Sequence, residues 1–125
     1  MRIATILVLL AASLAPLSAS AQPALNPNPL IWHGVQLGGE EVYEGEFTVD
    51  YATSTFLADG ASAQDAVWLS GWEDRPGDGG GITRRYHIRL IGRKSVEPGK
   101  FGSLGAYANT ILLIKLLSAR LLSQR

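Results

Sequence analysis

The chain has 125 residues, a formal net charge of zero and no cysteine. Without cysteine it has no disulfide framework and no residue for lipid attachment at a cleavage site. A neutral chain is also a poor general binder of nucleic acid, because that binding needs an excess of cationic side chains. The charges are nevertheless separated: residues 40–78 hold ten acids and one base, whereas residues 84–125 hold nine bases and one acid.

Residues 1–21 have the pattern of a secretory signal peptide. Arg2 precedes an apolar run over residues 3–15, and the small residues Ala19, Ser20 and Ala21 follow. A membrane helix needs about 20 apolar residues, and Pro16 ends this run before that length. We therefore expect export to the periplasm or the exterior, with cleavage after Ala21 and no transmembrane segment in the mature chain. Removal of 21 of the 125 residues leaves 104, the size of one domain.

The mature chain predicts a single β domain over residues 31–117. Residues 22–30 contain three prolines and two asparagines, which favours an extended leader outside the core. Residues 30–37 predict a short first strand that Gly38 and Gly39 end. Residues 41–51 alternate between apolar and polar side chains, as a half-buried strand does. Gly45 lies on the apolar side of that strand, where it permits sharp coiling or close approach of a neighbouring backbone.

The middle of the chain predicts one further strand between two connections. Residues 53–63 are small and polar around Phe56 and Leu57, and we expect a long connection that places Phe56 in the core. Residues 66–72 predict a strand with Trp68 and Trp72 on one face and Val67 on the other. Residues 73–81 have no large apolar side chain, and we expect a mobile loop there.

The last third of the chain predicts two paired strands. In residues 84–93 apolar side chains alternate with Arg85, His87 and Arg89, so that one face packs and the other meets water. Pro98 and Gly99 form a turn signal. Residues 109–117 are apolar all round, and their length and glycine-rich flank favour a buried strand centred on Ile114 over a helix spanning residues 109–122. Residues 118–125 predict a short C-terminal tail, which we expect to be helical.

Together these segments predict an all-β fold, a small barrel of five or six strands. One stretch also resembles small secreted bacterial proteins of uncharacterised function, which carry Gly-Arg-x-Ser followed by Gly-x-Phe-Gly-x-Leu-Gly-x-Tyr. The matching positions are Gly92, Arg93, Ser95, Gly99, Phe101, Gly102, Leu104, Gly105 and Tyr107. Ser103 departs from the histidine expected there, so no role of that histidine carries over. The order of strand, glycine, long turn and apolar strand resembles the closing strands of an OB-like (Greek-key) barrel.

The sequence predicts no catalytic, cofactor-binding or metal site. His33 and His87 each stand alone, without a second ligand at zinc-site spacing. The acids Glu73, Asp74 and Asp78 lack the ligand spacing of an EF-hand loop. Neither a nucleophile elbow nor a histidine with an acidic neighbour in sequence is present. An enzyme whose site is assembled from Asp, Ser and His on separate loops remains the alternative.

One basic face is a candidate for binding an anionic ligand. Its residues are Arg85, Arg89, Arg93 and Lys94. Clustered cations attract polyanions or an anionic membrane surface. The competing interpretation is an internal charge ladder, in which Glu44, Glu46 and Asp50 pair with Arg85, His87 and Arg89 across strands. We favour the ladder because the total charge cancels, and we expect an exported, non-enzymatic binding or structural module of the cell envelope with an unknown partner.

The export hypothesis makes a direct prediction about the N-terminus. We expect the protein isolated from the cell envelope or the medium to begin at Gln22, because signal peptidase cleaves after small residues in this arrangement. Intact mass and N-terminal sequencing measure this directly. An exported protein that still starts at Met1 would contradict the prediction.

Overall fold

The computed structural model describes residues 22–72 and 82–125. The predicted signal peptide and the expected loop at 73–81, with Glu73, Asp74 and Asp78, lie outside these residues. Within them the helical elements are the 3₁₀ turns η1 (Ala63–Asp65) and η2 (Ser103–Gly105). No helix in these two ranges is long and apolar enough to cross a membrane.

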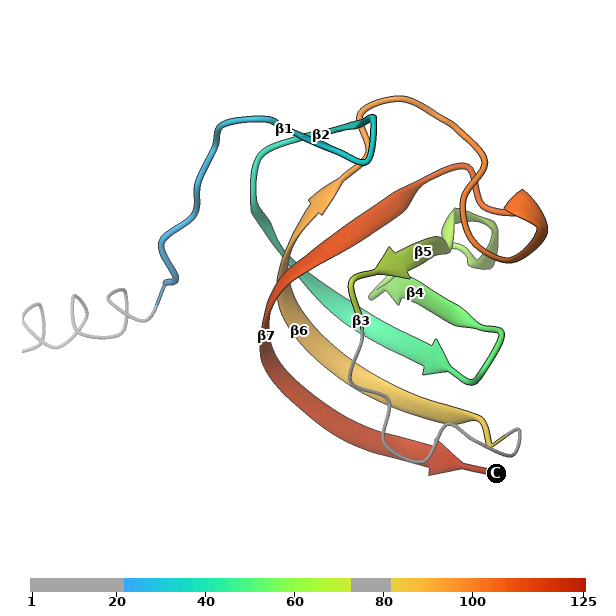
Figure 1. Ribbon diagram of the computed structural model, residues 1–125. Helices are drawn as coiled ribbons and strands as arrows, with labels where there is room; N and C mark the ends of the chain where they lie inside the picture. The colour runs from blue at the N-terminus through green and yellow to red at the C-terminus, as the bar shows by residue number, and fades with distance from the viewer. Residues whose placement is uncertain (1–21, 73–81) are drawn as a thin grey trace, which may run out of the picture.

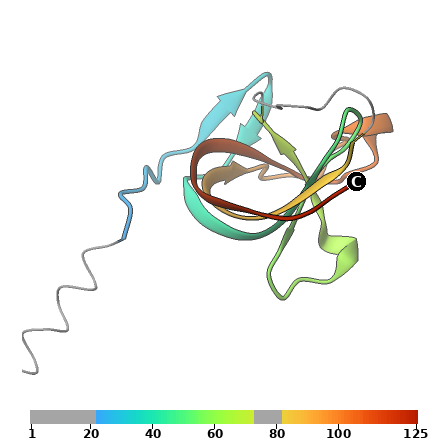
Figure 2. The ribbon, with the colours of Figure 1, turned by 90° about the horizontal axis from the view of Figure 1, so that it is seen from below.

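The described chain forms seven strands, and five of them close into a barrel (Figures 1 and 2). The strands are β1 (Leu30–Trp32), β2 (Val35–Leu37), β3 (Glu41–Val49), β4 (Ser54–Ala58), β5 (Val67–Ser70), β6 (Arg84–Lys94) and β7 (Thr110–Gln124). The ring order is β3-β4-β5-β7-β6, and β6 pairs back to β3. All contacts in the ring are antiparallel except β5 with β7, which is parallel. The predicted all-β, OB-like barrel is confirmed.

The barrel interior is filled by side chains that alternate along the strands. Phe47, Phe56, Leu69, Ile88 and Leu90 are essentially inaccessible to solvent. Phe56 is therefore in the core as predicted, although residues 54–58 form a strand and not the expected connection. Gly45 lies where β3 and β4 approach closely, because a Cβ there would lie 2.2 Å from the carbonyl oxygen of Leu57. The predicted close backbone approach at Gly45 is thus present.

Residues 30–37 form a hairpin, and the predicted single strand is wrong. His33 and Gly34 have φ values of 50° and 78°, which place both central residues in the left-handed region. Two such residues form the tight turn whose twist matches a β-hairpin. The hairpin β1–β2 forms a sheet separate from the barrel (Figure 2).

Residues 110–124 form one long strand, so the expected helical tail at 118–125 is wrong. Pairing with β6 continues to Gln124 and is interrupted by three register shifts. Each shift leaves one apolar residue of β7 without a partner opposite: Ile114, Leu117 and Leu122. Such bulges bend a strand and interrupt its alternation. Ile114 is consequently 42% exposed, and its predicted place at the centre of the core is also wrong.

Polar side chains reinforce the point where β5 meets β7. The Thr110 hydroxyl donates to the carbonyl oxygen of Trp68 at 2.8 Å and lies 2.7 Å from the Ser70 hydroxyl. The Thr110 N–H donates to the Ser95 hydroxyl at 3.1 Å, and Ser54 donates to the Leu69 carbonyl at 2.7 Å. No buried side-chain nitrogen or oxygen in the described residues lacks a partner. These bonds satisfy the polar groups that barrel closure removes from water.

Two isoleucines of β7, Ile111 and Ile114, test which part of this strand belongs to the core. Ile111 is 2% exposed, so Ile111→Ala should lower the free energy of unfolding by about 2 to 5 kcal/mol through lost burial and a cavity. Ile114→Ala, the matched control, should cost about 1 kcal/mol or less because the side chain is partly in water. Urea unfolding of the mature protein measures both. Equal midpoints for the two variants would contradict the assignment of Ile111 to the core.

Candidate functional site

The outer face of β3 and β6 carries an internal charge ladder. Arg85 Nε donates to Glu46 Oε1 at 2.7 Å, and Arg89 Nε lies 3.7 Å from Glu44 Oε1. His87 Nε2 also lies 3.8 Å from Glu44 Oε2, so three of the predicted cross-strand pairs are present. Asp50 is not part of the ladder, because it accepts hydrogen bonds from Thr83 and from the backbone N–H of Ala52. The cations of this face are thus partnered within the chain.

Tyr43 near the start of β3 and Asp50 directly after its end have shifted pKa values. Burial, together with the neighbouring Glu41 carboxylate, raises the pKa of Tyr43 well above its usual range. Tyr43 therefore stays protonated and donates to Glu41 Oε2 at 3.1 Å. For Asp50, burial raises the pKa, but hydrogen bonds from Ala52, Thr53 and Thr83 outweigh it and lower the pKa below the ordinary value. Both groups have structural partners and neither has the pKa of a proton donor at neutral pH.

Arg93 does not share the exposed face of Arg85 and Arg89. Its side chain is 6% exposed, and Nη1 donates to the carbonyl oxygens of Asn28 and Gly38. Glu40 Oε2 lies 3.7 Å from Nη2. Arg93 therefore joins the residues before β1 to the residues before β3. It acts as a buried anchor.

The same contacts show that the leader is attached to the domain. Asn26 and Glu40 are joined by two hydrogen bonds: Glu40 N–H to the Asn26 carbonyl at 2.8 Å, and Asn26 N–H to Glu40 Oε1 at 3.0 Å. These bonds attach the predicted leader to the domain, although the side chains of residues 24–30 remain exposed. Lys94, the fourth predicted site residue, is exposed and lines a hollow between η1 and residues 106–109 together with Asp65.

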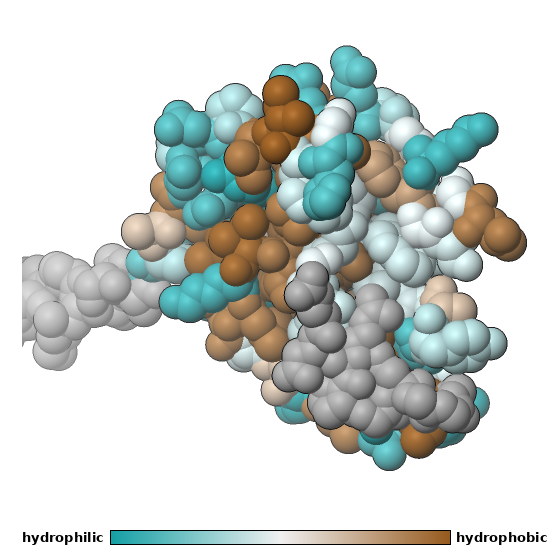
Figure 3. Space-filling model, viewed as in Figure 1, coloured by the Kyte–Doolittle hydropathy of each residue, from teal (hydrophilic) through white to brown (hydrophobic). Residues whose placement is uncertain are grey.

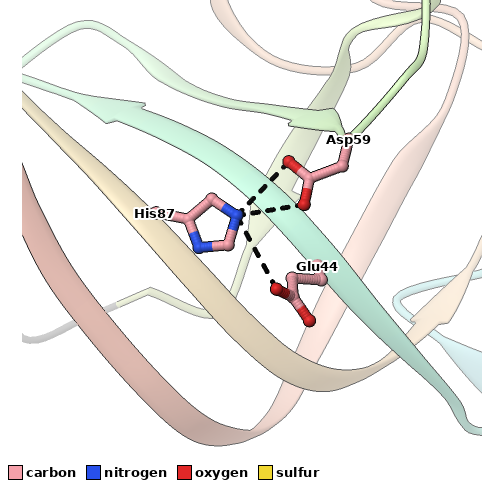
Figure 4. Close-up of side chains that lie close together, drawn as sticks. All are labelled: Glu44, Asp59 and His87. Atoms are coloured by element: carbon pink, nitrogen blue, oxygen red, sulfur yellow. Dashed lines mark hydrogen bonds and ion pairs between the residues drawn. The ribbon is translucent and has the colours of Figure 1, made fainter.

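Three neighbouring segments bring Glu44, Asp59 and His87 together on the outer face (Figure 4). Glu44 belongs to β3, His87 to β6, and Asp59 directly follows β4. His87 Nε2 lies 3.0 Å from Asp59 Oδ2 and 3.8 Å from Glu44 Oε2. The Asp59 N–H donates to the Glu44 carbonyl at 3.0 Å, so the backbone sets the spacing of the two acids. No spacing in the sequence indicates this group, because barrel closure assembles it.

The outer aromatic face of β5 is covered by the chain itself. The Trp68 ring is 5.7 Å from the Tyr107 ring, and a Cβ on Gly102 would lie 2.3 Å from the indole. OB folds that bind oligonucleotides or oligosaccharides use this region of the barrel. In this chain the loop of residues 101–107 occupies the stacking position on Trp68. The geometry therefore gives no support to base stacking at this face.

The second half of β7 is exposed and apolar. Its large apolar residues Ile114, Leu116, Leu121 and Leu122 are 38 to 51% exposed. Apolar surface gathers where β7 bends on the face seen in Figure 3. The β7 residues that pair with β5 are Thr110, Ile111 and Leu112, so among the described residues the following twelve residues of β7 have a strand partner on one side alone.

The exposed part of β7 is also basic. Lys115, Arg120 and Arg125 are solvent-exposed, and the chain contains no acid after Glu97. None of the three forms an ion pair with an acid in residues 22–72 or 82–125. The stretch of residues 114–122 is called the β7 surface below: Leu116 and Leu121 lie opposite Leu90 and Tyr86 of β6 and share their inner face, whereas Arg120 lies opposite His87 on the outer face. The continuous apolar run over residues 109–117 predicted burial, and residues 118–125 were expected to form a helical tail, so the surface was missed.

No family model, curated protein or solved structure matches this chain. The candidate sites therefore rest on the geometry of the chain alone.

The contrast between Arg93 and Arg85 can be measured. Arg93→Ala should lower the free energy of unfolding by about 3 to 5 kcal/mol, because it leaves buried acceptors and Glu40 without their partner. Arg85→Ala, the control, should cost at most about 1 kcal/mol, because its pair with Glu46 is exposed. Urea unfolding gives both values. In Arg93→Ala we also expect faster proteolysis between residues 22 and 29, and unchanged proteolysis would argue against the anchoring role.

Proposed function

We propose that the mature chain is an exported, non-enzymatic module that binds a protein of the cell envelope through the β7 surface. The observation that carries the proposal is the exposure of four large apolar side chains along one strand of a closed barrel. A contiguous apolar patch on a small soluble domain commonly marks an interaction site. The export signal predicted at residues 1–21 supports an envelope location.

The energetics favour a partner that covers these side chains. Full burial of one leucine or isoleucine contributes about 1.5 to 3 kcal/mol. The four apolar residues of the β7 surface keep roughly two fifths of their area in water in the free domain. Ordering of side chains and loss of overall motion on association offset part of that gain. The part of the burial free energy that is not offset in this way would stabilise the complex with the partner.

The charge of the β7 surface defines the chemistry of the partner. Within residues 22–72 and 82–125 Lys115 and Arg120 have no acid at ion-pair distance, so a partner that brings acidic and apolar side chains to the two sides of the β7 edge is complementary. A second copy of the chain would place the same cations against each other if the two β7 strands met. The favoured partner is therefore a different protein with an acidic and apolar surface.

The bulges of β7 define how the partner would dock. Regular pairing with β6 without a shift extends over Ser118–Leu121, and shifts interrupt the pairing on both sides. Bulges and basic residues at a strand edge oppose the addition of a long new strand. We therefore place the binding energy in side-chain contacts with Leu116 and Leu121, and backbone pairing plays a minor part.

Site-specific photocrosslinking tests the proposal in the producing cells. A photoreactive amino acid at position 121 should form an adduct with another envelope protein, and the crosslinked peptide should carry acidic residues. The same amino acid at position 104, where Leu104 is fully exposed on η2, should form no such adduct. Arg120→Glu in the position-121 variant should reduce the adduct, because it reverses the charge that attracts the partner.

Other outcomes would overturn the proposal. An adduct of twice the protein mass would assign the β7 surface to self-association. Label transferred to lipid would assign it to the membrane surface, which basic and apolar side chains also fit. Equal adducts from positions 104 and 121 would mean that the β7 surface has no special role. Circular dichroism of each variant verifies that the barrel is intact.

A further inference from the structure

We propose that Glu44, Asp59 and His87 form a binding site for a divalent transition metal ion, specifically Zn²⁺. The group offers one imidazole nitrogen and two carboxylates, and the candidate ligand atoms all lie within 4.8 Å of one another. The three candidate ligands belong to β3, to β6 and to the residue after β4, and none of them belongs to β7. The proposal therefore stands independently of the β7 surface.

The spacing of the ligand atoms suits a small ion. Zinc binds nitrogen and oxygen at about 2.0 to 2.2 Å with tetrahedral geometry, which separates ligand atoms by roughly 3.3 Å. His87 Nε2 is 3.0 Å from one carboxylate oxygen and 3.8 Å from the other, on either side of that value. Figure 4 shows both carboxylates directed at the same ring nitrogen. Small side-chain rotations would therefore bring all three groups around one ion.

The backbone holds the three residues in place without the metal. Gly45 pairs with Ala58 across β3 and β4, and Glu46 pairs with His87 across β3 and β6. The ligands therefore come from three adjacent segments of one hydrogen-bonded sheet. A preformed arrangement of this kind binds a metal without a large folding cost.

Glu44 has two long ion pairs in the described chain and no hydrogen bond to its carboxylate. Its carboxylate lies 3.7 Å from Arg89 and 3.8 Å from His87, and both distances exceed hydrogen-bond length. The side chain is about half exposed, so water and ions reach it. A proton on Nε2 of His87 can be donated to only one carboxylate at a time, whereas a metal ion in that position would bind both.

The donor set selects the class of metal. An imidazole ligand favours zinc and other late transition metals over Ca²⁺ and Mg²⁺, which prefer oxygen ligands in greater number. Three protein ligands with partial exposure leave the fourth position of a zinc ion to water. Arg89 beside Glu44, and Arg120 opposite His87 in β7, oppose the ion electrostatically. Removal of the Arg89 charge should therefore strengthen binding.

Calorimetric titration of the mature protein with Zn²⁺ tests the site. We expect one ion per chain, with Ca²⁺ binding at least about tenfold more weakly. His87→Gln should weaken zinc binding by at least about tenfold, since loss of an outer-shell contact alone costs that much. His33→Gln is the matched control, because His33 lies in the β1–β2 turn, and it should leave binding unchanged. Zinc should also shift the NMR signals of the His87 ring and leave the signals of the His33 ring unchanged.

Two further variants separate a metal site from an ordinary ion pair. Asp59→Asn should weaken zinc binding and Arg89→Ala should strengthen it, whereas a purely structural ladder would give no zinc dependence in either variant. Zinc binding that survives His87→Gln, or that is lost in His33→Gln, would overturn the assignment. Equal affinity for Zn²⁺ and Ca²⁺ would overturn it as well. Circular dichroism verifies that each variant is folded.

Discussion

The short parallel contact between β5 and β7 is the constraint on which the rest of the structure depends. The β5 residues that pair with β7 are Trp68, Leu69 and Ser70. Because β5 has four residues and β7 has fifteen, β5 can cover only a short part of β7. The contact closes the ring and buries Ile111 and Leu112. It also leaves the remainder of β7 with β6 as its strand partner among the described residues. The same closure therefore creates both the core and the β7 surface.

β6 organises the polar chemistry of the domain. It pairs with β3 and β7 along nearly its whole length, so its inner side chains fill the barrel and its outer side chains lie between two strands. At one end Arg93 is buried under the leader and binds backbone carbonyls. At the other end Arg85 and His87 face solvent beside acids of β3 and Asp59. The difference in burial therefore separates the two roles: Arg93 is a buried anchor, and Arg85 is part of the exposed ladder.

Local patterns in the sequence were sufficient to predict the strands that have one buried and one exposed face. β3 and β6 alternate because one face packs on the core and the other meets water, and that period is visible in a single strand. The cross-strand pairs of Arg85 and Arg89 followed from the same alternation and from the sorting of charges along the chain. The close approach at Gly45 was also predictable, since a glycine between inward aromatics has few other reasons to lie there.

The sequence by itself thus determined the all-β class and the alternating strands and favoured the charge ladder over an open binding face, because these depend on neighbouring residues. Tertiary structure alone decided which arginine is buried, which half of β7 is exposed, and that Asp59 joins Glu44 and His87. An apolar run is the same in sequence whether a neighbour covers it or not, and bulges shift its register without a local signal. Burial and ligand grouping depend on segments far apart in the chain, and these meet only when the barrel closes.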